Sequence, residues 1–201
     1  MWQTLLDADK HLFLVLNGGW GPGWDTFFYW VSARLTWVPL YAAMLYAVWR
    51  KWGWRGVLWV AVCLGITVGL SDQICNFFKH HTPKFRPTHT PDIEALVHTV
   101  RGYRGGLYGT VSAHSAISFA IAVFTSKLFG RRWYTAAIFL WALLVVYSRI
   151  YIGLHYPMDI FFGAVLGLAL AAVSAGICRR RLARIRTGAG AVDKDSNRTE
   201  S

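Results

Sequence analysis

Long apolar runs alternate with short polar segments along most of the chain. Five of these runs have about the length of a membrane-spanning helix, and they occupy residues 26–49, 57–78, 113–129, 133–148 and 157–178. Because a hydrocarbon core of roughly 30 Å is crossed by about 20 helical residues, each run is long enough, or nearly long enough, to span a bilayer. The pattern therefore predicts an all-α polytopic membrane helix bundle with about five transmembrane helices.

The opening segment, M-W-Q-T-L-L-D-A-D-K-H-L-F-L-V-L-N-G-G, has a different pattern. Asp7, Asp9 and Lys10 interrupt its apolar face, which is typical of an amphipathic helix that lies in the membrane interface. Gly18 and Gly19 favour the end of a helix, so the interfacial helix should stop there. The segment has neither a basic start nor a cleavage site, and we expect no removable signal peptide.

The composition also indicates a membrane protein. Of the 201 residues, 55% are hydrophobic, 16% are aromatic and only 15% are charged. The formal net charge of +11 would suit a nucleic-acid-binding protein, but the basic residues form short clusters between apolar runs and do not follow one face. We expect a single membrane-embedded domain over residues 1–186, a disordered cytoplasmic tail over residues 187–201, and no nucleic-acid partner.

The basic clusters predict the orientation of the bundle. Lysines and arginines gather within residues 50–55, 127–132 and 179–186, which lie on one side of the predicted spans. The positive-inside rule assigns that side to the cytoplasm. The N-terminus and residues 79–112 and 149–156 should then face the exterior, which is the periplasmic side if the protein lies in a bacterial inner membrane.

The predicted outer side nevertheless carries many ionisable side chains. They include Lys79, Lys84, Arg86, Arg101, Arg104 and Arg149, together with His114 and His155. Two interpretations compete: scattered contacts with lipid headgroups, or a pocket for an anionic group. The histidines favour the pocket, because they face the same compartment as the basic residues.

The stretch S-R-I-Y-I-G-L-H-Y-P-M-D, residues 148–159, has a spacing that suits catalysis. If a helix begins near His155, Asp159 lies on the same face, where its carboxylate can hold an imidazole nitrogen and fix the tautomer. Such an imidazole can attack phosphorus and form a phosphohistidine intermediate. A second histidine, His114, can then protonate the departing oxygen.

Other polar groups on this side suit a phosphoryl group. Lys79, Arg86 and Arg149 would stabilise the charge spread over its oxygens. Ser112 and the backbone N–H groups at the start of the third apolar run would add neutral donors at a helix N-terminus. This arrangement requires no metal ion and no cofactor.

Three motifs resemble those of the integral-membrane type 2 phosphatidic acid phosphatase family. The first, Lys, six residues and Arg-Pro, matches K-H-H-T-P-K-F-R-P over residues 79–87. The second, Pro-Ser-Gly-His, matches V-S-A-H over residues 111–114 in part, since Val111 and Ala113 replace proline and glycine. The third, Ser-Arg, five residues, His, three residues and Asp, matches residues 148–159 in full. Together, in this order and on one side of the bundle, the motifs are specific.

The resemblance implies a metal-independent membrane lipid phosphatase and a role for each matched residue. His155 resembles the nucleophile, Asp159 its orienting carboxylate and His114 the general acid. The phosphate-binding residues that the resemblance implies are Lys79, Arg86, Ser112, Ala113 and Arg149. Ala113 keeps its N–H donor but does not reach positive φ as glycine does, so this peptide must adopt an ordinary helical or extended geometry.

The loop between the first two motifs is a candidate for headgroup recognition. Within R-G-Y-R-G-G-L-Y-G, residues 101–109, the side chains of Arg101, Tyr103 and Arg104 would grip a second phosphate or a sugar. A flexible connection is the alternative. We expect a lipid to reach the site laterally, with its head in the charged pocket and its tail in the bilayer.

Among the substrates that the resemblance implies, undecaprenyl diphosphate is our first expectation. Phosphatidylglycerol phosphate, phosphatidic acid and a phosphate of lipid A follow. A phosphotransferase, in which an acceptor other than water attacks the phosphohistidine, stays open. A non-enzymatic transporter or channel is the alternative from another class, and it is disfavoured because the ionisable residues cluster on one side. The sequence predicts no oligomeric state.

Arg34 lies within the first apolar run, where a charge is costly. It should either snorkel outward or pair with an acidic residue, for which Asp72 near the outer end of the second run is the candidate. A role in the substrate cleft is the alternative to pairing. The sequence leaves both alternatives open.

Overall fold

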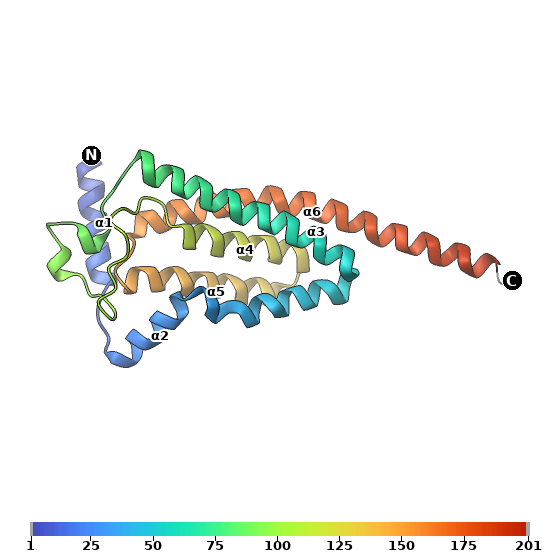
Figure 1. The fold of residues 1–201 in the computed structure, drawn as a ribbon, viewed down its shortest axis with the longest axis horizontal. Coiled ribbons are helices and arrows are strands. Elements are labelled where there is room, and N and C mark those ends of the chain that lie inside the picture. Colours follow the sequence, from blue (N-terminus) through green and yellow to red (C-terminus); the bar gives the residue numbers. More distant parts are fainter. Residues whose placement is uncertain (1, 200–201) are drawn as a thin grey trace.

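The computed structural model describes residues 2–199, and it describes the side-chain surroundings of residues 3–185. The longer helices are α1 (Trp2–Leu16), α2 (Pro22–Ser32), α3 (Val38–His81), α4 (Ala113–Phe129), α5 (Arg132–Tyr151) and α6 (Pro157–Thr199). Short 3-10 helices occupy Arg34–Trp37, Pro87–His89 and Glu94–Leu96. Figure 1 shows an elongated helix bundle, and no β-strand occurs among the described residues. The predicted all-α fold is confirmed.

Helix α3 crosses the bundle twice because it folds back at Gly53. This residue has φ 65° and ψ −169°, a left-handed backbone conformation that glycine adopts without a Cβ clash. Figure 1 shows the two arms of α3 running in opposite directions, with the turn at the end of the bundle far from α1. With α4, α5 and α6, the two arms make the five passes that the sequence predicts.

Three helical segments are long and apolar enough to cross a membrane by length and composition. They are Arg34–His81, Arg132–Tyr151 and Pro157–Ile185, and the first of them contains both arms of α3. Helix α4 is apolar but shorter. The chain is therefore a multi-pass membrane protein.

The first predicted span, residues 26–49, is wrong at its start. The structure divides this run into α2, which ends at Ser32, and the first arm of α3, which begins at Val38. Ala33 has an extended backbone, and Pro39 in the first turn of α3 lacks the N–H that would continue a helix from the preceding turn. As a result, Arg34 lies at an exposed junction between helices, at the very start of the apolar segment and not in the middle of a helix.

Helix α1 lies across one end of the bundle, as Figure 1 shows. The ring of Phe13 is fully buried and packs edge-on against Tyr156, with 5.3 Å between the ring centroids. Leu5, Leu12 and Val15 stay exposed. A helix that packs on the end of a membrane bundle and leaves apolar side chains uncovered suits the membrane interface. The predicted interfacial helix is confirmed, and it ends at Leu16.

Helices α4 and α6 pack closely because two glycines of α6 face the start of α4. A side chain at Gly163 would collide with the carbonyl oxygen of Ser112, and a side chain at Gly167 would collide with Ala116. Small residues four positions apart allow the backbones of membrane helices to approach one another. This contact holds the first turn of α4, which carries His114, against the first turns of α6.

Helix α6 continues beyond its apolar part to Thr199. The side chains of residues 186–199 are not described, and residues 200–201 lie outside the described residues. The division into a membrane domain over residues 1–186 and a disordered tail over residues 187–201 stays a prediction.

Candidate active site

Two loop segments that are distant in sequence pair with each other near the start of α6. Phe85 and Tyr108 form an isolated antiparallel β-bridge. The N–H of Arg86 donates a hydrogen bond to the carbonyl oxygen of Leu107 at 3.1 Å. This pairing holds the first motif alongside the segment that leads into the second motif.

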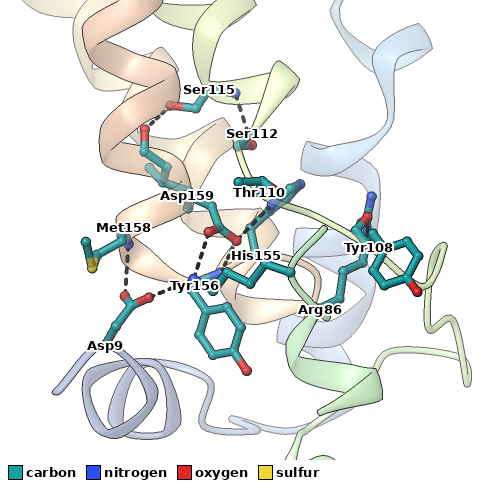
Figure 2. Close-up of polar contacts among 12 residues, drawn as sticks. Asp9, Arg86, Tyr108, Thr110, Ser112, Ser115, His155, Tyr156, Met158 and Asp159 are labelled. Carbon is teal, nitrogen blue, oxygen red and sulfur yellow. Dashed lines mark hydrogen bonds and ion pairs between the residues drawn. The ribbon is translucent and has the colours of Figure 1, made fainter. Parts of the chain in front are cut away.

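His155 lies in the loop between α5 and α6, and its imidazole faces Asp159 in the first turn of α6. The Nδ1 atom of His155 is 3.4 Å from Oδ2 of Asp159, and Figure 2 shows the two side chains pointing toward each other. The same carboxylate oxygen accepts a hydrogen bond from the N–H of Tyr156 at 3.1 Å. His155 is 4% exposed and Asp159 is 1% exposed. The contact that the spacing predicts is present and buried.

The end of α5 fixes the backbone that carries His155. The N–H groups of Leu154 and His155 donate to the carbonyl oxygen of Arg149 at 2.9 and 3.3 Å. Gly153 makes this turn with φ 80°, and a side chain there would lie 3.0 Å from the carbonyl oxygen of His98. Glycine is required here both for the backbone conformation and for the close approach.

Burial is the largest influence on the pKa of His155, which it lowers from 6.5 to about 4. The hydrogen bond and charge of Asp159 oppose this shift, while the charges of Arg86 and Arg149 add to it. The ring is therefore neutral near pH 7. When Nδ1–H donates to Asp159, the lone pair lies on Nε2, which is the form of imidazole that acts as a nucleophile.

Arg86 lies beside His155, with Gly109 between them. Its Nε donates to the carbonyl oxygen of Tyr108 at 3.1 Å. A side chain at Gly109 would lie 3.0 Å from Cγ of Arg86 and 3.4 Å from Cε1 of His155. Burial lowers the pKa of the Arg86 guanidinium, but arginine starts from so high a value that it stays charged. A positive charge thus stands next to the imidazole.

Arg149, on α5, supplies a second guanidinium and is only 8% exposed. Its Nη1 donates a hydrogen bond to Oγ of Ser32 at the end of α2. Its Nε is buried and has no hydrogen-bond partner among the described residues. Buried donors without a partner are uncommon in proteins, and a phosphoryl oxygen would satisfy this one.

The second motif forms the start of α4. The Oγ of Ser112 accepts a hydrogen bond from the N–H of Ser115 at 3.4 Å, and the N–H of Ser112 donates to the carbonyl oxygen of Asp159 at 3.0 Å. The Ser112 N–H is therefore not available to a ligand. The Ser112 hydroxyl remains, as do the N–H groups of Ala113 and His114, which belong to a first turn without intrahelical acceptors.

His114 is half-buried in the first turn of α4. Its ring interacts electrostatically with Arg149, Arg34, His155 and Arg86. The two histidines of the motifs therefore share one positively charged environment at the same end of the bundle.

A cavity of about 380 Å³ lies beside His114 and extends between α3, α4 and α5. Most of its walls are apolar, and they include Trp37, Met44, Leu64, Ile121, Leu128 and Val145. Leu128 lies fourteen residues after His114 on α4, a distance of about 21 Å at the helical rise of 1.5 Å per residue. A polar group at one end and a long apolar wall suit a lipid chain whose head lies near His114.

Lys79 lies in the last turn of α3 and is half-buried. Within the described part of the chain it forms no ion pair, and the contacts that join the other predicted site residues do not include it. Its role in phosphate binding stays a prediction.

The predicted headgroup residues point in different directions. The guanidinium of Arg101 lies over the ring of Tyr29, 4.2 Å from the centroid. Arg104 donates to the carbonyl oxygen of Thr88 and pairs with Glu94 at 2.6 Å. The side chain of Tyr103 is 54% exposed and lies near Arg86. Their recognition of a headgroup stays a prediction.

The sequence-based reasoning did not assign Lys84 or Asp9 to the site. The Nζ of Lys84 lies 3.0 Å from Oδ1 of Asp159 and 3.2 Å from Oδ2 of Asp9. Lys84 falls within the six-residue spacer of the first motif, where the motif specifies no residue type. Asp9 has the pattern of an ordinary polar residue on an amphipathic helix.

The structure favours one of the two alternatives for Arg34. Asp72 accepts a hydrogen bond from Asn76 at 3.1 Å, and no ion pair joins it to Arg34 among the described residues. Arg34 instead lines the cavity beside His114.

No group of three or more His, Cys, Asp or Glu side chains in the described part of the chain is arranged to hold a metal ion. Whether the reaction is independent of metal stays a prediction.

Comparison with known proteins links this site to a family. The family model described as the PAP2 superfamily matches residues 56–182. A lipid A 4'-phosphatase of Bacteroides thetaiotaomicron is 39% identical over 169 residues, which cover 83% of this chain and 75% of the relative. A lipid A 4'-phosphatase of Porphyromonas gingivalis is 41% identical over 167 residues, which cover 83% of this chain and 71% of the relative.

Two solved structures share the fold. The crystal structure of Aquifex aeolicus LpxE aligns with a TM-score of 0.63 and 24% identity, over 82% of this chain and 92% of that one. A transmembrane PAP2 type phosphatidylglycerolphosphate phosphatase from Bacillus subtilis aligns with a TM-score of 0.65 and 19% identity, over 88% and 87%. The family match and the two relatives show that this chain belongs to the PAP2 superfamily and is a bacterial multi-pass membrane lipid phosphatase.

Proposed function

We propose that the protein hydrolyses a phosphate ester on the sugar of lipid A, at the extracytoplasmic face of the bacterial inner membrane. The two relatives that are named lipid A 4'-phosphatases support this substrate over undecaprenyl diphosphate, our first expectation from the sequence. The observation that carries the chemistry is the buried contact between His155 and Asp159 beside two guanidinium groups.

The reaction takes place in two displacements. Nε2 of His155 attacks phosphorus, and the bond between phosphorus and the sugar oxygen breaks. His114, which takes up a proton when the bound phosphate dianion offsets the positive charges around it, gives that proton to the departing oxygen. Asp159 stabilises the positive charge of the phosphorylated ring through Nδ1–H. Water then attacks phosphorus, the phosphorus–nitrogen bond breaks, and His114 takes a proton from the water. Inorganic phosphate leaves, and both histidines return to their starting states.

The phosphoryl oxygens lie among fixed donors. Arg86 and Arg149 supply permanent positive charge, and the unpartnered Nε of Arg149 gains an acceptor. The Ser112 hydroxyl and the Ala113 N–H donate from the start of α4. Lys79 approaches from the end of α3. These donors stabilise the transition state, because charge accumulates on the oxygens as the phosphoryl group transfers.

The lipid reaches the site laterally from the membrane. One acyl chain lies in the apolar cavity beside His114, and the phosphorylated sugar lies toward the solvent. Tyr103 contacts the sugar or a second phosphate. Arg101 and Arg104 join it when they leave their present contacts with Tyr29 and Glu94.

A phosphate-release panel tests this proposal. The purified protein in detergent is given lipid A, undecaprenyl diphosphate, phosphatidylglycerol phosphate and phosphatidic acid, each with and without chelator. We expect the highest kcat/KM on lipid A, no effect of chelator, and a loss of at least about 1,000-fold in His155→Ala. His80→Ala, which replaces an exposed histidine at the end of α3, is the matched control and should stay within about twofold of the parent.

Each other result has a definite meaning. A preference for another lipid of the panel would replace the substrate, whereas full activity in His155→Ala would end the phosphohistidine mechanism. Loss of activity with chelator would end metal independence. Transfer of phosphate to an added alcohol at the expense of free phosphate would indicate a phosphotransferase.

A further inference from the structure

A lysine lies between two buried carboxylates behind the nucleophile. The Nζ of Lys84 is 3.2 Å from Oδ2 of Asp9 and 3.0 Å from Oδ1 of Asp159. The two aspartates are only 5% and 1% exposed. The other oxygen of Asp159 contacts His155 at 3.4 Å. The four side chains therefore form a row from Asp9 through Lys84 and Asp159 to His155.

Asp9 is held in this row from two sides. Its Oδ1 accepts a hydrogen bond from the N–H of Met158, in the first turn of α6, at 2.9 Å. Figure 2 shows the Asp9 carboxylate facing this backbone, next to Tyr156. One turn further along α1, Phe13 packs against Tyr156, and the ammonium group of Lys84 lies 4.2 Å from the centroid of the same ring. The interfacial helix is thus tied directly to the element that carries the orienting carboxylate.

We propose that Asp9 and Lys84 are positioning residues of the phosphatase, which hold Asp159 in place and set how much negative charge it offers to His155. This inference rests on the proposed function, because it concerns groups behind the proposed nucleophile. Lys84 fixes the carboxylate of Asp159 through an ion pair in which the carboxylate is buried and the lysine is half-buried. The ion pair with Asp9 offsets part of the positive charge of Lys84, so that more of the negative charge of Asp159 acts on the imidazole.

The balance of charge explains why both residues are needed. Two buried carboxylates that share one half-buried lysine would repel each other without it, and one of them would take up a proton. Conversely, Lys84 without Asp9 would neutralise Asp159 more fully and weaken its support of the phosphorylated imidazole. Breaking one partner of a buried ion pair is costlier than removing the whole set.

Among the charged groups near Asp9, Lys84 is the cation that offsets the charges of the two carboxylates. Burial raises the pKa of Asp9, the Met158 N–H and Lys84 oppose that shift, and the charge of Asp159 adds to it. Lys10, the next residue on α1, pairs with the exposed Asp92 at 3.0 Å. Tyr156 is neutral at physiological pH, and burial keeps it so by raising its pKa to about 12.

A mutant cycle on the full-length protein tests the proposal. Lys84→Met, Asp9→Asn and the double variant are assayed from pH 4 to 9 on the panel lipid that the parent cleaves in a His155-dependent manner. Lys84→Met should lose about tenfold in kcat with KM nearly unchanged, a coupling of ordinary size for a buried network. The acid limb of its pH profile, which is the fall of kcat at low pH, should move to higher pH. The reason is that removal of the lysine charge raises the pKa values of His155 and of both carboxylates.

Removal of Asp9 from the Lys84→Met protein should restore part of the lost activity and move the acid limb back toward the parent, because one of the two repelling carboxylates is gone. Asp9→Asn alone should lower kcat by about threefold. Lys84→Arg should keep the acid limb of the parent. Asp92→Asn breaks the exposed ion pair that Lys10, the neighbour of Asp9 on α1, makes with the loop, so it is the matched control and should change kcat by less than about twofold.

If the losses of the two single variants add and all variants have the same acid limb, the proposal is overturned. Asp9 and Lys84 would then only hold α1 on the bundle. Equal effects of Asp9→Asn and Asp92→Asn would also overturn it. If Lys84→Met fails to fold, as shown by size-exclusion chromatography in detergent, Asp9→Asn and Lys84→Arg still decide the question through kcat and the pH profile. A parent that cleaves no panel lipid, or an active His155→Ala, would instead refute the proposed function.

Discussion

At the scale of single residues, the properties of His155 follow from a competition between burial and charge. Burial favours the neutral ring, and so do the positive charges of Arg86 and Arg149. The carboxylate of Asp159 favours the protonated ring but does not win. A neutral, oriented imidazole is what attack on phosphorus requires, and the cations that we propose to bind phosphate also keep the proposed nucleophile unprotonated.

This competition predicts the acid limb of the reaction. Since the pKa of His155 is lowered to about 4, the nucleophile stays unprotonated well below the ordinary value of 6.5. The kcat/KM of the parent should therefore keep its His155-dependent plateau below pH 6 and fall only as the pH approaches about 4. The check is a pH profile of kcat/KM with a buffer series of constant ionic strength.

The lowered pKa of His155 also makes the stability of the folded protein depend on pH. A histidine with a lower pKa in the folded state binds more protons when unfolded, so its contribution to stability is lost as the pH falls through 6.5 toward 4. Thermal unfolding over this range serves as the control that separates loss of structure from titration of the nucleophile. An acid limb at 6.5 or above in a protein that is still folded would contradict the burial of this imidazole.

Local spacing predicts some contacts of the site and not others. The contact of His155 with Asp159 was predictable, because four residues on one helical face suffice to bring the two side chains together. Lys84 is separated by 75 residues from each of its two partners. Its contacts depend on how α1 and the loop after α3 pack on the bundle, and no spacing rule contains that information.

At the scale of elements, the close contact of α4 with α6 determines the distance between the two halves of the site. His114 lies in the first turn of α4, Asp159 lies in the first turn of α6, and His155 lies in the loop that leads into α6. The absence of a side chain at Gly163 lets the Ser112 carbonyl approach α6. This contact is therefore as important for catalysis as the side chains that carry it out.

A larger residue at Gly163 should separate the two histidines. We expect Gly163→Leu to destabilise the protein by about 1–3 kcal/mol through overpacking. Because an error of about 1 Å in the position of reacting groups costs on the order of 100-fold, kcat should fall by that amount in the fraction that stays folded. Phosphate release per folded molecule, with folding measured by thermal unfolding in detergent, checks this prediction.

Gly176→Leu provides the matched control for Gly163→Leu, because it makes the same change on the same helix. A side chain at Gly176 meets no atom within 4 Å, so activity should stay within about twofold of the parent. Equal losses in the two variants would show that α6 tolerates no leucine, and full activity in Gly163→Leu would remove the argument from helix contact.

Hydropathy predicted the helices of the bundle better than it predicted their ends. The fifth run begins at Pro157 in both the prediction and the structure. For the first run the predicted and observed starts differ, because the sequence from Thr26 stays largely apolar through the break between helices at Ala33. Pro39 lies in the first turn of α3, where proline is common. From the sequence alone, however, one cannot tell whether this proline begins a new helix or lies within a longer one.

At the scale of the whole molecule, the fold separates two ends of different chemistry. The site lies at the end that carries α1, and the turn at Gly53 lies at the other end with the loop between α4 and α5 (Figure 1). The cysteines Cys63, Cys75 and Cys178 are all buried and free, so the described surface has no cysteine that would react with a polar reagent. The two ends can therefore be labelled separately through introduced cysteines.

The proposed orientation predicts which end reacts in intact cells. Asp92→Cys places a thiol on the exposed loop beside the site, and Arg131→Cys places one on the exposed loop between α4 and α5. With the outer membrane permeabilised and the inner membrane intact, a membrane-impermeant maleimide should label Asp92→Cys and should label Arg131→Cys only after the inner membrane is opened. The positive-inside rule favours this order, because Arg131 belongs to one of the three basic clusters that the rule assigns to the cytoplasm. The reverse order would place the phosphatase site in the cytoplasm, and lipid A would then have to meet it before export from the inner leaflet.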